Sequence, residues 1–145
     1  IRNCDWSSDV CSSDLNEKIL WGFISKYDNS LSPEKSVFLN KLVKLGVNYY
    51  NDFIKSNKSY RKPNKDEVSA LIKLKEELLN NNTIDAKELQ NIVYKIGNDL
   101  NFDLKTWFQA LYEILLGQSK GPRMGSFIAL FGIDETIELI NSKLP

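Results

Sequence analysis

Apolar residues recur every three or four positions along residues 16–145, which places them on one side of an α-helix in segment after segment. Clusters of Gly, Asn and Pro separate these segments, and no run alternates apolar and polar residues as a half-buried strand would. The pattern predicts an all-α fold, a bundle of about seven helices joined by short loops. No unit repeats at a fixed period, which argues against a regular solenoid.

Several helices are predicted to begin at residues that satisfy free backbone N–H groups. Asn64 and Asp85 are each followed three positions later by a glutamate, which is the spacing of a capping box. Ser32-Pro33-Glu34 predicts the start of a long helix that continues to Phe53. Near the C-terminus, Pro122 is expected at the first position of a helix and Asp134 at the N-cap of the last one.

Glycines are expected to end three of the helices, because glycine adopts a positive φ at little cost. These are Gly97, Gly117 and Gly132, which stand where apolar stripes stop. The stripe before Gly117 is the strongest, and its aromatic members are expected in the core, because aromatic residues at helical spacing usually pack there. Only an exposed ring could stack on a base. It comprises Leu104, Trp107, Phe108, Leu111, Tyr112 and Leu115. The helix from Ser32 carries another apolar face, made of Val37, Phe38, Leu42, Leu45, Tyr49 and Phe53.

The first fifteen residues are expected to lie outside the fold. Residues 5–14 resemble an in-frame translation of a common sequencing-library adapter, and Cys4 and Leu15 fit the same reading. We therefore expect residues 1–15 to be an artefact of sequence assembly and residues 16–145 to be the domain. Since Cys4 and Cys11 are the only cysteines, no disulfide or cysteine metal site is expected in the domain.

The charge balance of the domain is mild. Residues 1–15 hold one of the 19 basic and three of the 19 acidic residues, so residues 16–145 carry a net charge of +2. A net charge of +2 is too small to produce the strong positive field expected of an independent nucleic-acid-binding domain. No apolar run is long enough to cross a membrane, and no signal peptide is evident, so a cytosolic protein with no membrane partner is expected.

The residue types predict neither a catalytic nor a metal site. The chain has no histidine, which is the usual general base and the commonest metal ligand. Gly117, Gly121 and Gly125 follow a helix and not a strand, so they fit neither a P-loop nor a dinucleotide-binding fingerprint. The adjacent carboxylates Glu76-Glu77 and Asp134-Glu135 point in different directions on a helix and are expected to be solvated. Binding is the class of function that remains.

Two basic stretches are candidates for contact with a phosphate backbone. The first lies in a predicted loop and suits either a phosphate backbone or the negative end of a helix; it contains Lys55, Lys58, Arg61, Lys62 and Lys65. The second is Lys120 and Arg123 at a predicted helix start, where free N–H groups favour an anion. Two roles stay open for Arg123: contact with RNA, or binding of the carbonyl groups that end the preceding helix.

The C-terminal part of the chain resembles a known family. Residues 107–118, Trp-Phe-Gln-Ala-Leu-Tyr-Glu-Ile-Leu-Leu-Gly-Gln, and residues 121–130, Gly-Pro-Arg-Met-Gly-Ser-Phe-Ile-Ala-Leu, are similar to the C-terminal end of class I lysyl-tRNA synthetases. Residues 20–24, 42–43, 48–53 and 60–63 resemble that family in the same order, so the similarity covers nearly all of residues 16–145. A shorter match, Leu-x-Gly followed by Gly-Pro, is shared with the related helical region of glutamyl-tRNA synthetases.

The resemblance implies a helical region that cages the anticodon loop of lysine tRNA. For the parent enzyme it implies a Rossmann-type domain that activates lysine with ATP and magnesium and transfers it to the tRNA. The chain contains neither the His-x-Gly-His motif nor the Lys-Met-Ser-Lys-Ser-like loop of class I enzymes. We therefore expect an inactive C-terminal fragment, with tRNA as its partner and no cofactor of its own.

Six residues are candidates for tRNA binding under this resemblance: Lys58, Arg61, Lys62, Gln118, Lys120 and Arg123. Two other hypotheses stay open. One is the C-terminal region of a glutamyl-tRNA synthetase, which would share the fold and the RNA partner. The other is a non-enzymatic helical scaffold that binds another protein.

Overall fold

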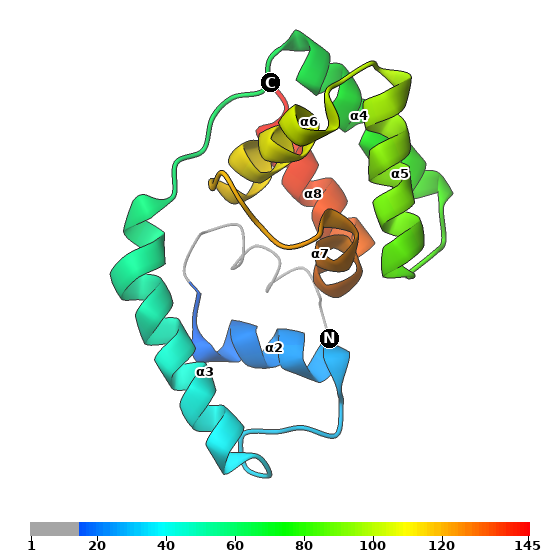
Figure 1. Ribbon diagram of the computed structural model, residues 1–145. Coiled ribbons are helices and arrows are strands. Elements are labelled where there is room, and N and C mark those ends of the chain that lie inside the picture. Colours follow the sequence, from blue (N-terminus) through cyan, green and yellow to red (C-terminus); the bar gives the residue numbers. More distant parts are fainter. Residues whose placement is uncertain (1–14) are drawn as a thin grey trace. The chain divides into compact units, whose positions relative to one another are not determined.

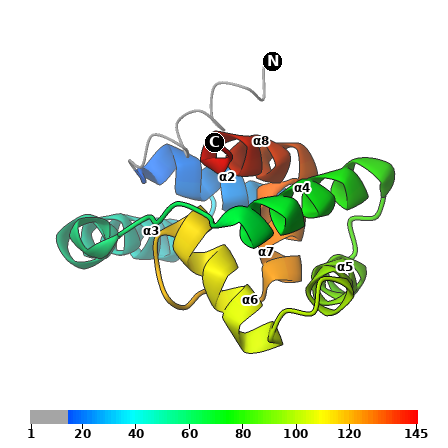
Figure 2. The ribbon, with the colours of Figure 1, turned by 90° about the horizontal axis from the view of Figure 1, so that it is seen from above.

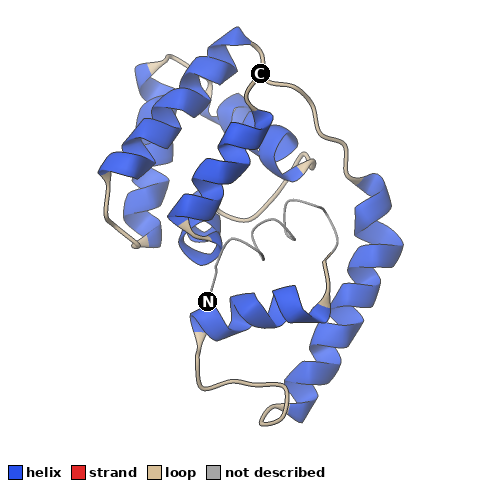
Figure 3. Ribbon diagram, turned by 180° about the vertical axis from the view of Figure 1, so that it is seen from behind, coloured by secondary structure: helices blue, strands red, loops and turns tan. Residues whose placement is uncertain are grey.

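The computed structural model describes residues 15–145, and these form seven α-helices and no strand (Figure 3). The helices are α2 (Glu17–Tyr27), α3 (Val37–Tyr49), α4 (Lys65–Asn80), α5 (Ala86–Asp99), α6 (Leu104–Leu111), α7 (Met124–Phe131) and α8 (Ile133–Lys143). The π-helical segments η1 (Tyr50–Ile54) and η3 (Tyr112–Leu116) continue α3 and α6, and a short 3-10 turn, η2 (Lys55–Asn57), follows η1. The prediction of an all-α fold is confirmed. The prediction about residues 1–15 lies outside the described residues except at Leu15.

The chain divides into two compact units at residues 57 and 58. In the described part of the first unit, α2 packs against α3. Asn16 caps α2 by accepting a hydrogen bond from the backbone N–H of Ile19 at 2.9 Å. Trp21 is buried, and its Nε1 donates to Oδ1 of Asn40 at 3.1 Å, which ties the two helices together next to Val43.

The long helix begins later than the sequence predicts. Ser32-Pro33-Glu34 forms a turn in which the carbonyl of Ser32 accepts from the N–H of Ser36 at 2.9 Å. Because Ser36 has a ψ of 67°, the chain leaves the helical conformation there, and α3 starts at Val37. The predicted start at Ser32 is therefore wrong. The apolar face that runs along α3 into η1 is largely exposed; its exposed members are Val37, Phe38, Leu42, Leu45, Tyr49 and Phe53.

The second unit, residues 58–145, contains the main apolar core. Asn64 and Glu67 form the predicted capping box at the start of α4, with both reciprocal hydrogen bonds in place at 2.9 and 2.8 Å. Asp85 caps α5 as predicted, but its carboxylate accepts from the second N–H of the helix, that of Lys87, at 3.3 Å. Trp107 is fully buried, as expected, and its Nε1 donates to the carbonyl of Val93 at 3.1 Å.

The glycines of this unit have two different structural roles. Gly117 and Gly132 have φ values of 69° and 115° and end helical segments, as predicted. Gly97 does not end α5, which continues to Asp99. A Cβ at Gly97 would lie 2.8 Å from Cδ1 of Trp107, so glycine here makes room for the indole ring.

The two predicted helix starts near the C-terminus are displaced. α7 begins at Met124 with Arg123 at its N-cap, so Pro122 lies before the helix and not at its first position. Gly132 is the N-cap of α8, which places Asp134 inside the first turn. An acidic residue in the first turn still interacts favourably with the positive end of the helix.

α7 lies beside both α5 and α8 (Figures 1 and 2). Its approach to α5 is closest at the buried Gly125. A Cβ at Gly125 would lie 2.5 Å from the backbone nitrogen of Gln90, 2.7 Å from Cβ of Gln90, and closer still to the carbonyl oxygen of Ala86. The backbone N–H of Gly125 also donates to Oε1 of Gln90 at 2.7 Å. These contacts fix the position of the start of α7 on α5.

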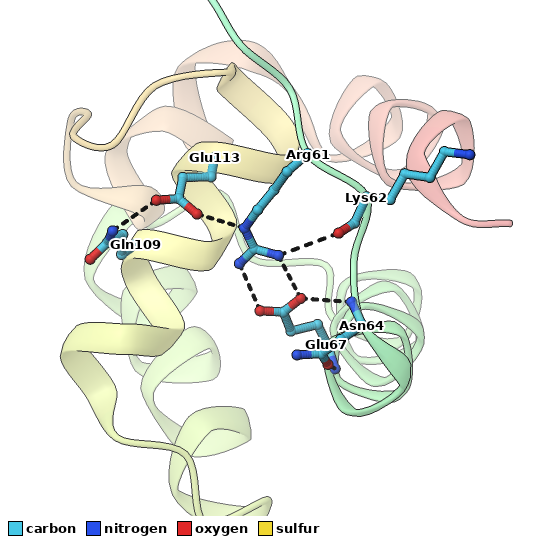
Figure 4. Close-up of polar contacts among 6 residues, drawn as sticks. All are labelled: Arg61, Lys62, Asn64, Glu67, Gln109 and Glu113. Atoms are coloured by element: carbon cyan, nitrogen blue, oxygen red, sulfur yellow. Dashed lines mark hydrogen bonds and ion pairs between the residues drawn. The ribbon is translucent and has the colours of Figure 1, made fainter.

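Arg61 fixes the segment that leads into α4 (Figure 4). Its two terminal nitrogens donate to the carboxylate of Glu67 at 2.7 and 2.8 Å, and Nε donates to Oε2 of Glu113 on η3 at 2.6 Å. Gln109 donates to the other oxygen of Glu113 at 2.7 Å. The Glu67 side chain is only 6% exposed, so its charge depends on this bidentate partner.

The electrostatics of this cluster follow from the geometry. Hydrogen bonds from Arg61 hold the pKa of Glu67 below its usual range, although burial acts in the opposite direction. Arg61 likewise lowers the pKa of Glu113, with help from Gln109. Glu67 and Glu113 together raise the pKa of Arg61, so the guanidinium stays charged.

Removing this cation tests its structural role. We expect Arg61→Met to lower the free energy of unfolding at neutral pH by about 2 kcal/mol, less than for a fully buried pair because Arg61 is 39% exposed to solvent. Because the folded-state pKa of Glu67 is lowered, the stabilisation is complete above the unfolded-state pKa and is lost as pH falls through the folded-state value. Urea unfolding by circular dichroism at neutral and acidic pH measures the loss. An equal loss at both pH values, or an equal loss in the exposed control Lys62→Met, would contradict the assignment.

The close approach of α7 to α5 gives a second prediction. We expect Gly125→Ala to destabilise the protein by about 2 kcal/mol, because the added methyl group meets backbone atoms that cannot rotate away. Ser126→Ala, at the exposed neighbouring position in the same helix, should change stability by less than about 0.5 kcal/mol. Urea unfolding of the two variants makes the comparison. Equal stabilities for the two variants would show that α7 and α5 are not in close contact.

Candidate nucleic-acid interface

A groove of about 370 Å³ lies between α5 and the start of α7. Two cations, two amides, a hydroxyl group, a phenol ring and one alanine line it. These residues are Ala86, Lys87, Gln90, Asn91, Tyr94, Arg123 and Ser126. The set combines positive charge, hydrogen-bonding groups and an aromatic surface, which are the components that single-stranded nucleic acid needs.

Helical spacing gathers the α5 side of the groove. Lys87, Gln90, Asn91 and Tyr94 are three, four and seven positions apart, so they share one face of the helix. The other face is buried in the core and comprises Leu89, Ile92, Val93 and Ile96. The same amphipathic pattern that anchors α5 therefore presents the polar side of the groove.

Arg123 enters the groove from the N-cap position of α7. The side chain is exposed and makes no hydrogen bond or ion pair with the described part of the chain. The alternative role for Arg123, binding the carbonyl groups that end the preceding helix, is therefore absent in this conformation. Tyr112 instead holds the turn before α7, because its hydroxyl donates to the carbonyl of Pro122 at 2.8 Å and its ring packs where a Cβ at Gly121 would lie.

The start of α7 has fewer N–H groups available to an anion than the sequence suggests. Gly125 lies in the first turn, where N–H groups have no partner within the helix, but its N–H already donates to Gln90. An anion at this end would therefore depend more on the side chains of Arg123 and Lys87 than on the helix itself.

Tyr94 supplies the exposed aromatic ring of the groove. It is 41% exposed, and its ring meets that of Phe108 edge-on, with centroids 5.0 Å apart. The contact holds the ring of Tyr94 in place while leaving part of its surface open. Burial raises the pKa of the Tyr112 hydroxyl, and the interaction with the nearby Tyr94 raises it further. The Tyr112 hydroxyl therefore remains a hydrogen-bond donor at neutral pH.

A second polar region forms where residues 58–62 cross the corner at Gly117. The N–H of Ser59 donates to the carbonyl of Gly117 at 2.9 Å, which brings the neighbouring Lys58 and Gln118 close to each other. Tyr60 packs on Gly117 with ring atoms 3.0 Å from its ideal Cβ position, and the ammonium of Lys143 lies 4.0 Å from the centroid of the Tyr60 ring. Lys58 and Gln118 are both half-buried in this corner.

The remaining predicted residues have different surroundings. Arg61 is engaged by Glu67 and Glu113, so its guanidinium serves the fold in this conformation. Lys62 is exposed, and its side chain extends away from those carboxylates (Figure 4). Lys120 is exposed in the turn before α7. Of the six candidates, Arg123 alone lines the groove.

Sequence reasoning missed the α5 side of the groove. Its signal was present as the i, i+3, i+4, i+7 spacing of Lys87, Gln90, Asn91 and Tyr94 opposite an apolar stripe. That spacing alone describes any solvated helix face. The groove requires α7 to pack beside it, through a contact that joins residues 35 positions apart in the chain.

Residues 15–145 contain no group of three or more acidic, histidine or cysteine side chains arranged to bind a metal ion. None of the described helices is both long and apolar enough to cross a membrane.

The chain is similar to one family model and to a group of enzymes that share one name. Residues 31–144 match the family described as "Anticodon binding domain". The lysine–tRNA ligase of Rickettsia felis is 40% identical over 139 residues, which cover 94% of this chain and 26% of that protein. The lysine–tRNA ligase of Roseobacter denitrificans is 42% identical over 134 residues, 92% of this chain and 25% of that protein. The chain spans about a quarter of the length of these relatives. Because the family match covers most of its residues, the chain belongs to the anticodon binding domain family.

Proposed function

We propose that this chain is the C-terminal anticodon-binding region of a class I lysine–tRNA ligase and that it binds the anticodon loop of lysine tRNA. The family match supports anticodon binding, and the names of the relatives support lysine as the amino acid. The resemblance of residues 107–118 and 121–130 to class I enzymes supports the class. The groove between α5 and α7 is the observation that carries the proposal.

The groove has a suitable group for each part of an unpaired nucleotide. The exposed face of Tyr94 is available for stacking of a base, an interaction that is typically worth about 1–3 kcal/mol. Lys87 and Arg123 carry the positive charge that a phosphate group needs, and Arg123 offers the planar fork that favours two parallel hydrogen bonds. Gln90 and Asn91 lie on α5 about one helical turn from both Lys87 and Tyr94, and their side-chain amides line the groove, where they can meet base edges.

The chemistry of lysine activation would reside in other parts of the ligase. The chain has no histidine, and its described residues show no carboxylate cluster for magnesium. The relatives are about four times as long as this chain, and we assign the binding of ATP, magnesium and lysine to the part of such a ligase that lies outside the matched region. We place the activity of the ligase in the cytoplasm. This chain would contribute recognition of the uridine-rich lysine anticodon.

Binding of anticodon stem-loops tests this proposal. We expect the chain to bind the lysine stem-loop more tightly than one with a glutamate anticodon or a scrambled loop, and to lose affinity steeply as salt rises. Arg123→Gln should weaken binding of the lysine stem-loop roughly tenfold, because a charge-assisted contact is lost. Fluorescence anisotropy at several fixed salt concentrations measures each dissociation constant.

A matched control lies on the same helix as Lys87. Lys95 forms an exposed ion pair with Glu77 at 3.7 Å and does not line the groove. Lys95→Gln removes one positive charge, as Arg123→Gln does, and should change the affinity by less than about twofold. Equal effects of the two substitutions would point to general charge attraction. Equal affinity for all three stem-loops would overturn the proposed function.

A further inference from the structure

The amide of Gln90 has one orientation in this fold. Its Oε1 accepts the N–H of Gly125 at 2.7 Å, and an amide nitrogen cannot accept that hydrogen bond. A flipped amide would leave the buried Gly125 N–H facing a second donor, which is costly. Gln90 therefore keeps its carbonyl oxygen on α7 and retains its NH₂ group as a donor for the groove that it lines.

The two cations of the groove have the same polarity as this NH₂ group. Lys87 and Arg123 only donate hydrogen bonds, and none of the residues that line the groove carries a carboxylate. Asn91 and Ser126 can both donate and accept, so they adapt to the ligand. A ligand fits this donor-rich surface when the edge that it presents carries acceptor oxygens.

Nucleobases differ in this property at C4 of the pyrimidines and C6 of the purines. Uracil and guanine have a carbonyl oxygen there, whereas cytosine and adenine have an amine. An amine opposite the NH₂ group of Gln90 places two donors together and leaves both without a partner. The fixed amide thus discriminates between bases by the polarity of one group.

Resting on the proposed function, we propose that the groove holds one unstacked uracil of the anticodon loop and that Gln90 Nε2 donates to its 4-carbonyl oxygen. Gln90 is then a specificity-determining residue that selects uracil over cytosine at one position of the loop. Gly125 is the positioning residue, because its N–H sets the amide orientation and its missing Cβ lets α7 approach α5.

Gln90→Glu is the most direct test, because glutamate has nearly the same shape. One carboxylate oxygen can still accept from the Gly125 N–H, while the other presents an acceptor in place of the NH₂ donor. The probes are lysine stem-loops in which each anticodon uridine is replaced in turn by cytidine. For the unmodified chain we expect one of these replacements to weaken binding roughly tenfold. For Gln90→Glu we expect the cytidine loop to bind more tightly than the uridine loop at that position, with no reversal at the other positions.

Asn98→Asp is the matched control, since it adds the same charge to an exposed residue of the same helix outside the groove. It should weaken binding of all loops alike and leave the uridine-to-cytidine ratio unchanged. If Gln90→Glu also weakens all loops alike, the role of Gln90 is overturned while the proposed function stands. If the unmodified chain does not distinguish the lysine loop from a scrambled loop, the proposed function itself fails.

A change on the RNA side keeps the test independent of protein stability. Replacing the selected uridine with a 2-pyrimidinone ribonucleoside removes the 4-carbonyl oxygen and the N3–H, as cytidine does, but adds no amine and leaves the chain unmodified. We expect binding to weaken about as much as with cytidine, roughly tenfold. Undiminished binding of this analogue at every anticodon position would overturn the inference.

Discussion

The contact between α5 and α7 at Gly125 is the constraint on which the groove depends. Only a residue without a Cβ fits against Ala86 and Gln90, and the same residue donates its N–H to the Gln90 side chain. This contact determines where Arg123 and Ser126 lie, because they flank Gly125 at the start of α7. One glycine thus links core packing, the shape of the groove and the polarity of its hydrogen-bonding surface.

The basic residues of the chain serve different physical purposes. Arg61 neutralises the nearly buried Glu67, whose carboxylate also closes the capping box of α4, and it binds Glu113 on η3. Its removal would leave a buried charge without a partner. Arg123 has no such partner among the described residues and lines the groove instead. Charge counting alone cannot separate these two arginines, because the difference arises from their tertiary neighbours.

Local signals in the sequence predicted much of the fold. Asn64 begins a helix and Gly117 ends one because a cap or a positive φ depends on a few adjacent residues. Ser32-Pro33-Glu34 has the same composition as a helix start, yet the turn it forms ends at Ser36. The groove could not be predicted in this way. The spacing from Lys87 to Tyr94 describes a polar face, but only tertiary packing shows that α7 lies beside it.

The proposed site of contact with the anticodon loop is the α5–α7 groove. The most direct measurement is amide chemical-shift mapping by NMR of the ¹⁵N-labelled chain during titration with the lysine anticodon stem-loop. We expect the largest shifts on residues 87–94 and 123–126, with the Gly125 amide among them, and we expect that a scrambled loop does not reproduce them. Saturable, loop-specific binding that leaves these residues unshifted would contradict the proposed site.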